Sequence, residues 1–414
     1  MNRKLIGPFR QLLPMNELPL KGPLKNENLK VIKDGGIVIE NDKIIELGDF
    51  EKLASSASKY SEIVEIVKDQ VALPGLIDSH THICYAGSRA GDYELRNSGV
   101  SYLEIAKQGG GIWDTVQKTR AASKEELKDG LISRIKRLVQ SGITTVEVKS
   151  GYGLSAEAEL KMLGAMSEVR EISDIDLVLT CLAAHIFPKD FDGTSEHYLS
   201  EIERTLFPKL KPEFNCHRID AFIEEEAFSV DQIRPFLSEA KQYGLDITVH
   251  ADQFSPLASP LAIEVDAVSA DHLEASTEDE IRKLAWSETV ATVLPGASIG
   301  LGIPFAPARK LLNAGACVAI ASDWNPGSGP MGDLLIQASI LGAYEKLSSA
   351  EVFAGITYRA AHALRQSDRG KLESNMLADI VAFPCDDYRE ILYNQGMIRP
   401  SSVWKNGKRI FHNL

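Results

Sequence analysis

Two histidines two positions apart, His80 and His82, follow the apolar segment 73–77. Residues i and i+2 of a strand share a face, so both imidazoles can reach one ion. Alone, such a pair would indicate no more than a polar surface. Two further residues, His250 and Asp323, also end apolar segments of strand length. Together the four residues predict a metal site with three imidazoles and one carboxylate.

This ligand set suits one divalent or trivalent ion per subunit, zinc or iron, and leaves a position for water. The ion would lower the pKa of that water towards about 7, which makes hydroxide available at neutral pH.

His272 and His185 end two more apolar segments. A base beside the metal must titrate near neutral pH, so we expect His272, together with Asp323, to be catalytic. A fifth-ligand role and a core role for His272 stay open. For His185 the position predicts a substrate contact, with a structural role as the alternative.

The middle of the chain alternates apolar segments with helical patterns. The apolar segments are 71–78, 143–148, 175–184, 219–223, 245–249, 266–270, 289–294 and 316–321, and the clearest helical patterns are 124–140, 155–170, 196–210, 229–243 and 277–286. This alternation predicts a (β/α)8 TIM barrel, an α/β fold with its active site at the carboxyl ends of the strands. A doubly wound open sheet is the rival, but no G-x-G-x-x-G motif opens the first helix.

Both ends of the chain have β-like patterns instead. Asn41-Asp42 separates two short apolar segments near the start, and Asn406-Gly407 is a strong two-residue turn near the end. We therefore expect a small β-sandwich domain built from residues 1–72 and 371–414, and a hydrolase barrel over residues 73–370.

Composition excludes several classes of protein. The chain has 414 residues with 44% hydrophobic and 25% charged side chains, and no apolar run approaches the length of about 18 residues that a spanning helix needs. A net charge of −13 argues against nucleic acid as a partner. The five cysteines are scattered, which indicates a reducing, cytoplasmic location without disulfides. A homodimer is the prior expectation for such a protein.

Several motifs resemble a known family. Residues 74–82 (PGLIDSHTH) look like the opening signature of the amidohydrolase superfamily, and 370–373 (GKLE) with 378–381 (ADIV) resemble its return into the β domain. Within the superfamily the chain resembles the imidazolonepropionases. The segments that carry this resemblance are 86–89 (AGSR), 109–112 (GGGI), 147–154 (EVKSGYGL), 250–253 (HADQ), 269–273 (SADHL) and 323–328 (DWNPGS).

The resemblance implies hydrolytic ring opening of 4-imidazolone-5-propanoate to N-formimino-L-glutamate in histidine degradation. It places the metal on His80, His82, His250 and Asp323. It places substrate contacts on Arg89, Tyr152, His185 and Gln253, with Tyr102 as a weaker candidate, and the propanoate or product end on Asn325, Gly327 and Ser328. The expected partner is thus a small anionic substrate.

The residues themselves allow plainer interpretations. Arg89 can grip a carboxylate with two donors, or it can pair with Asp92 or Glu94. Tyr152 lies in a Gly-Tyr-Gly turn but could be ordinary packing, and Tyr102 also fits the start of an amphipathic helix. Asn325 and Ser328 could simply form a turn.

Two positions limit which residues can transfer protons and how many metal ions the site can hold. Gln253 stands where cytosine-deaminase-like members of the superfamily have Glu. Glutamine cannot shuttle a proton, so acid and base work moves to His272 and Asp323. Lys149 ends the second apolar segment, whereas relatives with two metals use a carboxylated lysine from a later strand, so we expect one metal.

Two rival functions remain. A deaminase of the same superfamily, acting on a heterocycle or a formimino acid, would release ammonia, whereas ring opening releases none. A barrel that has lost its metal and serves as a structural oligomer would have broken ligand positions, and all four are intact here.

Overall fold

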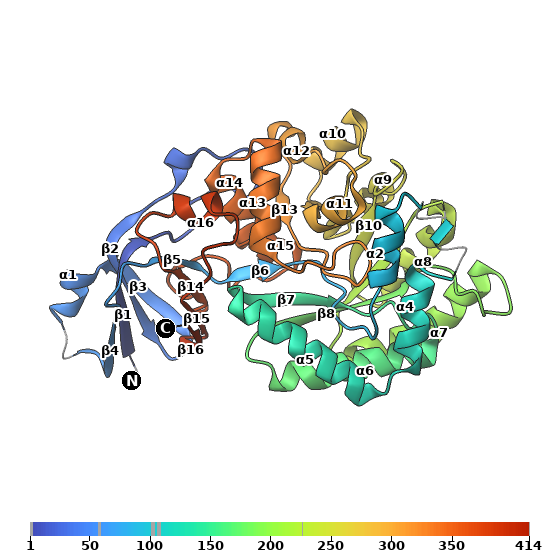
Figure 1. The fold of residues 1–414 in the computed structure, drawn as a ribbon, viewed down its shortest axis with the longest axis horizontal. Helices are drawn as coiled ribbons and strands as arrows, with labels where there is room; N and C mark the ends of the chain where they lie inside the picture. The colour runs from blue at the N-terminus through green and yellow to red at the C-terminus, as the bar shows by residue number, and fades with distance from the viewer. Residues whose placement is uncertain (1–2, 57–58, 101–103, 106–108, 226, 414) are drawn as a thin grey trace.

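The computed structural model describes residues 3–56, 59–100, 104–105, 109–225 and 227–413. Two sheets of eight strands each lie side by side: a barrel, and a sheet formed by the shorter end segments of the chain (named the smaller sheet for that reason), which carries both chain termini (Figure 1). The barrel sheet is parallel throughout, as the eight apolar segments predict. Its strands are β6 (Leu76–Asp78), β7 (Ile143–Lys149), β8 (Asp176–Ala184), β9 (Arg218–Phe222), β10 (Asp246–Ala251), β11 (Ser269–His272), β12 (Val290–Val293) and β13 (Val318–Ile320).

The barrel closes just beyond its first and last strands. Thr81 and Trp324 form an isolated parallel bridge. On either side of it, the Asp323 N–H donates to the His80 carbonyl at 3.1 Å and the His82 N–H to the Trp324 carbonyl at 2.9 Å. The backbone that closes the barrel thus carries three of the four predicted metal ligands.

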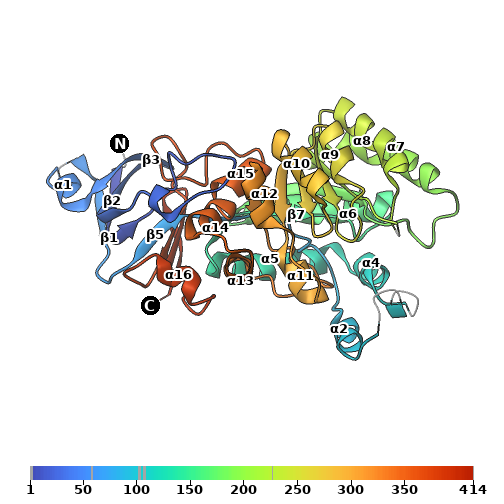
Figure 2. The same ribbon diagram turned by 90° about the horizontal axis from the view of Figure 1, so that it is seen from above.

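Most helices cover the barrel, as the patterns predict, whereas the short helix at residues 50–54 packs on the other sheet. Ser123, Ser155, Ser229 and Thr277 all accept a backbone N–H as helix N-caps. The helices are α1 (Phe50–Ala54), α2 (Ala90–Asn97), α4 (Ile112–Ala121), α5 (Lys124–Gln140), α6 (Ala156–Ile172), α7 (Ser195–Phe214), α8 (Val230–Gln242), α9 (Ser259–Glu264), α10 (Glu278–Trp286), α11 (Pro295–Leu301), α12 (Ala308–Ala314), α13 (Leu334–Glu345), α14 (Ser349–Gly355), α15 (Tyr358–Ala363) and α16 (Arg389–Tyr393). Seen from above, α2 and α4 project to one side of the barrel (Figure 2).

The smaller sheet is mixed and has the order β16-β15-β14-β5-β1-β2-β3, with β4 paired to β1. Its strands are β1 (Arg3–Leu12), β2 (Ile32–Glu40), β3 (Lys43–Asp49), β4 (Glu62–Glu65), β5 (Val71–Pro74), β14 (Ile380–Phe383), β15 (Ser402–Lys405) and β16 (Lys408–His412). Its strands share one core cluster, in which the rings of Phe9 on β1 and Trp404 on β15 lie 6.2 Å apart between centres. The strands form one continuous mixed sheet, and the sandwich arrangement stays a prediction.

The first apolar segment, 71–78, contributes one strand to each of the two sheets. It divides at Gly75 into β5, in the smaller sheet, and β6, in the barrel. A side chain at Gly75 would place its Cβ 2.3 Å from Thr144 Oγ1. Only glycine lets the chain cross between the sheets this close to β7.

Both predicted turns are present. Asn41 joins β2 to β3 with φ 58°, and Asn406 and Gly407 join β15 to β16 with φ 53° and 73°. Two consecutive positive φ values match a type I′ hairpin turn. All five cysteines are free, as expected, and all five are buried. Among the described residues, no helix combines the length and apolar character that a bilayer crossing needs.

The first 30 residues contain no motif that predicts a role for them. In the structure, residues 13–31 run across the amino-terminal ends of β12 and β13. The Gly22 N–H donates to the Ala316 carbonyl at 2.9 Å, and Lys21 Nζ donates to the Ser287 carbonyl at 2.7 Å. This segment therefore covers the end of the barrel opposite the predicted site.

Candidate active site

Three imidazoles converge at the carboxyl end of the barrel. His82 Nε2 lies 3.2 Å from His80 Nε2 and 3.2 Å from His250 Nε2. All three side chains are buried, and their ligand atoms lie within 4.8 Å of one another. The sequence predicts this cluster, because β6 and β10 end at the same rim.

Asp323 lies beside the cluster. Its Oδ1 lies 3.4 Å from His82 Nε2 and 3.7 Å from His80 Nε2. Ligand atoms about 2.1 Å from a tetrahedral zinc ion lie about 3.4 Å from one another, which is close to both spacings, and the role of Asp323 as fourth ligand stays a prediction. The donor set, three imidazole nitrogens and one carboxylate oxygen, also suits zinc or iron.

Two aspartates lie behind the imidazoles. His80 Nδ1 and Asp271 Oδ2 form a hydrogen bond of 2.7 Å, which holds the proton on Nδ1 and leaves Nε2 as a lone-pair donor. Asp220 Oδ2 lies 2.9 Å from His250 Nδ1, and Asp220 Oδ1 accepts the backbone N–H of His250 at 3.2 Å. The sequence assigned neither aspartate a role, although Asp271 lies in the motif 269–273.

The electrostatics keep the ligands neutral. Burial, and then the positive charge of Lys149, lowers the pKa of His80 well below its ordinary value. Burial, and then His250, does the same for His82. Metals bind the neutral imidazole, so the protein holds both side chains in the form that an ion requires.

His272 lies beside the cluster in a strained backbone. Its φ is 89°, a value that non-glycine residues seldom adopt, and its ring centre lies 5.3 Å from that of His250. Burial lowers the pKa of His272, but the carboxylates of Glu274, 3.4 Å from Nδ1, and of Asp323 and Asp271 together outweigh burial and raise it. His272 thus differs from His80 and His82, whose pKa values are lowered, in favouring protonation.

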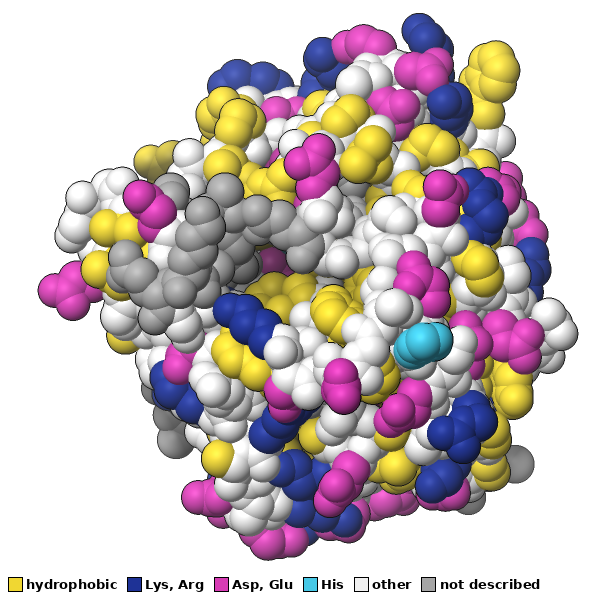
Figure 3. Space-filling model, turned by 90° about the vertical axis from the view of Figure 1, so that its right-hand side faces the viewer, with side chains coloured by type: hydrophobic (Ala, Val, Ile, Leu, Met, Phe, Trp, Pro, Cys, Tyr) yellow, Lys and Arg dark blue, Asp and Glu magenta, His cyan; other side chains and the backbone are white. Residues whose placement is uncertain are grey.

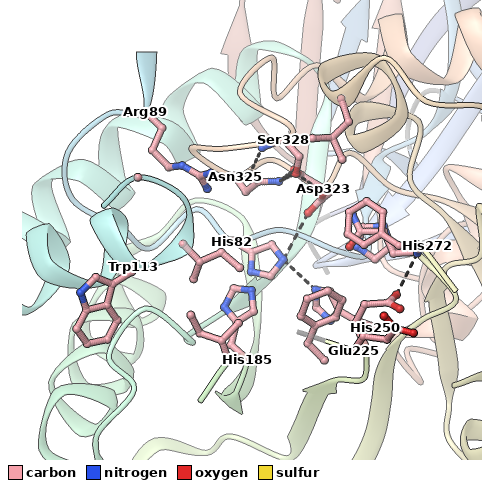
Figure 4. A pocket seen from close by; sticks show the side chains of 18 of the residues that line it. His82, Arg89, Trp113, His185, Glu225, His250, His272, Asp323, Asn325 and Ser328 are labelled. Atoms are coloured by element: carbon pink, nitrogen blue, oxygen red, sulfur yellow. Dashed lines mark hydrogen bonds and ion pairs between the residues drawn. The ribbon is translucent and has the colours of Figure 1, made fainter. Parts of the chain in front are cut away.

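A cavity of about 850 Å³ opens above the cluster. The hollow lies on the face farthest from the smaller sheet (Figure 3). The predicted residues that line it are His82, Arg89, Tyr152, His185, His250, Gln253, His272, Asp323, Asn325 and Ser328. Figure 4 shows Arg89 and Asn325 above the imidazoles, with Trp113 and Glu225 at the sides.

The ion-pair interpretation of Arg89 is confirmed, because its Nε donates to Asp92 Oδ2 at 2.8 Å. Arg89 also lines the cavity, and its contact with a substrate carboxylate stays a prediction. The guanidinium packs so closely on the backbone of Gly327 that a Cβ there would lie 2.1 Å from Nη1. Gly327 itself does not line the cavity, so its contribution is to make room for the guanidinium.

His185 and Tyr152 form one wall of the cavity. His185 Nδ1 lies 2.9 Å from the Gly151 carbonyl, which fixes the proton on Nδ1 and leaves Nε2 as an acceptor. Burial lowers the pKa of His185 to about 3. The Tyr152 ring lies 5.5 Å from that of His185, between centres, so the two present a largely aromatic surface.

The Asn325 side chain holds its own loop together. Its Oδ1 accepts the Gly327 and Ser328 N–H groups at 2.7 and 2.8 Å, and its Nδ2 donates to the Asp323 carbonyl at 2.7 Å and to Ser328 Oγ at 2.9 Å. The turn interpretation therefore describes what this side chain does, and its substrate contact stays a prediction. Tyr102 lies outside the described residues.

Sequence reasoning missed several residues of the cavity wall. Trp113 and Phe222 contribute aromatic surface, Arg96 a second cation, and Glu225 an exposed carboxylate. These residues follow no motif and lie on different elements, so no spacing in the sequence joins them.

Comparisons with known proteins agree with this geometry. Residues 71–410 match the amidohydrolase family. Imidazolonepropionase from Fusobacterium nucleatum is 39% identical over 390 residues, which cover 94% of each chain. Imidazolonepropionase from Bacillus cereus strain G9842 is 39% identical over 403 residues, covering 96% of this chain and 94% of the relative.

Solved structures show the same fold. Atrazine chlorohydrolase from Arthrobacter aurescens TC1, complexed with zinc, superposes with a TM-score of 0.71 at 18% identity, covering 99% of this chain and 95% of the other. Guanine deaminase from C. acetobutylicum, with bound guanine, gives 0.69 at 18% identity, covering 99% and 100%. The chain therefore belongs to the amidohydrolase family, and within it to the group that contains the imidazolonepropionases.

Proposed function

We propose that this protein opens the ring of 4-imidazolone-5-propanoate by hydrolysis and yields N-formimino-L-glutamate. The observation that carries the proposal is the cluster of His80, His82 and His250 with Asp323 at the floor of a cavity that also contains Arg89. A metal centre and a cation in one cavity match a cyclic amide with an anionic tail, and full-length relatives carry the corresponding name.

The four ligand residues would hold one ion, zinc or iron. When bound, that ion supplies hydroxide at neutral pH and polarises the ring carbonyl. His272 borders the cavity and is placed to take a proton from the attacking water and to return it to the ring nitrogen as the C–N bond breaks. Asp323, beside His272 at the same rim, would share in receiving the proton of the attacking water.

The rest of the cavity would orient the substrate. Arg89 presents a guanidinium to the carboxylate tail, and a charge-assisted pair of this kind also fixes direction. His185 offers Nε2 as an acceptor for a ring N–H, and Tyr152 covers the ring from the side. Gln253 supplies an amide, which can donate and accept but cannot transfer a proton.

A cytoplasmic location and a homodimeric state belong to the same proposal. Five buried free cysteines suit a reducing compartment. Size-exclusion chromatography with light scattering measures the oligomeric state directly.

The decisive experiment is a ring-opening assay combined with metal analysis of the same sample. Purified protein is mixed with 4-imidazolone-5-propanoate, and both N-formimino-L-glutamate and ammonia are measured. We expect the formimino product, no ammonia and one zinc or iron per chain. Ammonia release would favour the deaminase, and a protein without metal or turnover would favour the structural oligomer.

A further inference from the structure

Lys149, at the end of β7, is fully buried below the imidazoles, and the proposed mechanism does not use it. Its Nζ lies 2.7 Å from Glu147 Oε1, 2.9 Å from Asp220 Oδ2 and 4.0 Å from Asp271 Oδ2. An ammonium group buried this deeply is costly unless carboxylates surround it. Lys149 has such partners on three strands, β7, β9 and β11.

Two of these partners are the aspartates that orient the metal ligands. Asp220 Oδ2 approaches both Lys149 Nζ and His250 Nδ1, each at 2.9 Å. Asp271 Oδ2 lies 2.7 Å from His80 Nδ1, and Thr248 Oγ1 donates to the same oxygen at 2.9 Å. The Lys149 ammonium group is therefore linked to two of the three imidazoles. Asp220 lies between Lys149 and His250, and Asp271 lies between Lys149 and His80.

The Lys149 side chain is also positively charged at neutral pH. Burial alone would lower its pKa, but Asp220 and Glu147 outweigh burial and raise the pKa above its ordinary value. Arg218, the other buried cation of this group, lies 3.9 Å from Glu147 and forms no ion pair with Asp220 or Asp271 in the described part of the chain.

We infer that Lys149 is a positioning residue of the metal centre: it holds Asp220 and Asp271 in place and so directs the Nε2 atoms of His250 and His80 at one point. Without the ammonium group, the carboxylates of Glu147, Asp220 and Asp271 repel one another in a site with little water. The two imidazoles then lose their fixed acceptors, and the ion loses pre-oriented ligands. This inference rests on the proposed metal centre but not on the proposed substrate.

The chain offers a matched control in Lys405 on β15. Its Nζ lies 2.7 Å from Asp176 and 2.7 Å from Asp379, and its side chain is 5% exposed. Lys405 is thus another buried lysine with two aspartates, but those aspartates contact no metal ligand. Lys149→Met and Lys405→Met remove the same group from two comparable surroundings.

The test is titration of the metal-free proteins with Co2+ and Zn2+ alone, followed by the Co2+ absorption spectrum and by calorimetry. We expect Lys149→Met to bind either ion about 10–100-fold more weakly, the usual effect of losing a residue that orders the ligands, and to change the Co2+ spectrum. Lys405→Met should bind as the parent does, although both variants lower the free energy of unfolding of the metal-free protein.

If Lys149→Met fails to fold, the double variant Glu147→Gln/Lys149→Met replaces it, because it removes one carboxylate together with the ammonium group. Parental affinity and an unchanged Co2+ spectrum in either variant would overturn the inference and leave Lys149 a purely structural residue. A parent protein that binds no Co2+ or Zn2+ would instead overturn the proposed metal centre.

Discussion

At the amino-terminal end of the barrel, the chain pairs buried charged groups with its own backbone and side chains. Arg359 on α15 donates from Nη2 to the Gly22 carbonyl at 2.8 Å and to the Pro19 carbonyl at 3.3 Å. Glu351 on α14 accepts the Leu24 N–H at 3.1 Å and two donors of Arg309 at 2.8 and 2.9 Å. Both side chains fasten residues 13–31 to the barrel.

At the carboxyl end of the barrel, the polar groups instead face one common position, where an ion could bind. Three Nε2 lone pairs and a carboxylate oxygen converge, and the neighbouring backbone is strained at His272, with φ 89°. Such strain persists only where the surrounding structure enforces it. The difference shows how one barrel divides its tasks: one end stabilises the fold, and the other is arranged for a bound ion and a substrate.

The largest effect should follow the loss of a metal ligand. In His82→Ala we expect no bound zinc or iron and no detectable turnover, because the site loses its central nitrogen. The free energy of unfolding of the metal-free protein should stay the same or rise, since a buried imidazole is removed from a crowded cluster. Elemental analysis, the ring-opening assay and denaturant unfolding measure these three quantities. The exposed His197→Ala is the control, and a strongly destabilised apo-His82→Ala would contradict the contrast between the two ends.

The next effect concerns proton transfer. His272→Ala should lower kcat by about 10²–10⁴-fold, the range that a positioned acid or base supplies, while metal content stays at the parental value. Steady-state kinetics with metal analysis of the same sample measures both. Parental kcat in this variant would remove His272 from the mechanism and leave its strained backbone without a chemical explanation.

A smaller effect should follow the loss of the anchoring cation. Arg89→Gln should lower kcat/KM by about 10–150-fold, mostly through KM, because a charge-assisted hydrogen bond contributes about 1.5–3 kcal/mol. A substrate analogue with an amide in place of the carboxylate should be processed equally well by parent and variant. An equal decrease in kcat/KM for both substrates would show that Arg89 supports the cavity wall and does not bind the substrate carboxylate.

The smallest effect on turnover should come from the amino-terminal end. Glu351→Gln breaks the charged pair with Arg309 and should lower the free energy of unfolding by about 1.5–3 kcal/mol, with kcat and metal content unchanged. Denaturant unfolding and the ring-opening assay check the two halves of this prediction. A large decrease in kcat would contradict the proposal that the amino-terminal end stabilises the fold without taking part in turnover.

Glu351→Gln should also change how the free energy of unfolding depends on pH. In the folded protein burial raises the pKa of Glu351, but the hydrogen bonds from Arg309 and the backbone outweigh burial and lower it. A carboxyl group with a lowered folded pKa adds stability above its unfolded pKa and loses that contribution as the pH falls through the folded value. The parent should therefore lose more stability than Glu351→Gln when the pH is lowered through this range.

Much of the fold could be predicted from local patterns. Helix α5 spans Lys124–Gln140, the range that its helical pattern predicts, and the Asn406-Gly407 turn follows from its residue types. The division of segment 71–78 between two sheets could not be predicted, because an uninterrupted apolar run looks the same whether one sheet or two will bury it. Gly75 marks the crossing, but only the nearby Thr144 shows why a glycine is required there.

The sequence by itself determined the chemistry that this protein can perform. It placed His80, His82, His250, His272 and Asp323 at strand ends, and a strand end in a parallel barrel faces the site wherever it lies in the chain. Only the tertiary structure decided which buried groups support that chemistry. Lys149, Asp220 and Asp271 lie on separate strands and meet because the barrel closes, so no spacing along the chain predicts their contact. Strand ends follow from local periodicity, whereas the partners of a buried charge depend on register and closure, which the whole chain determines together.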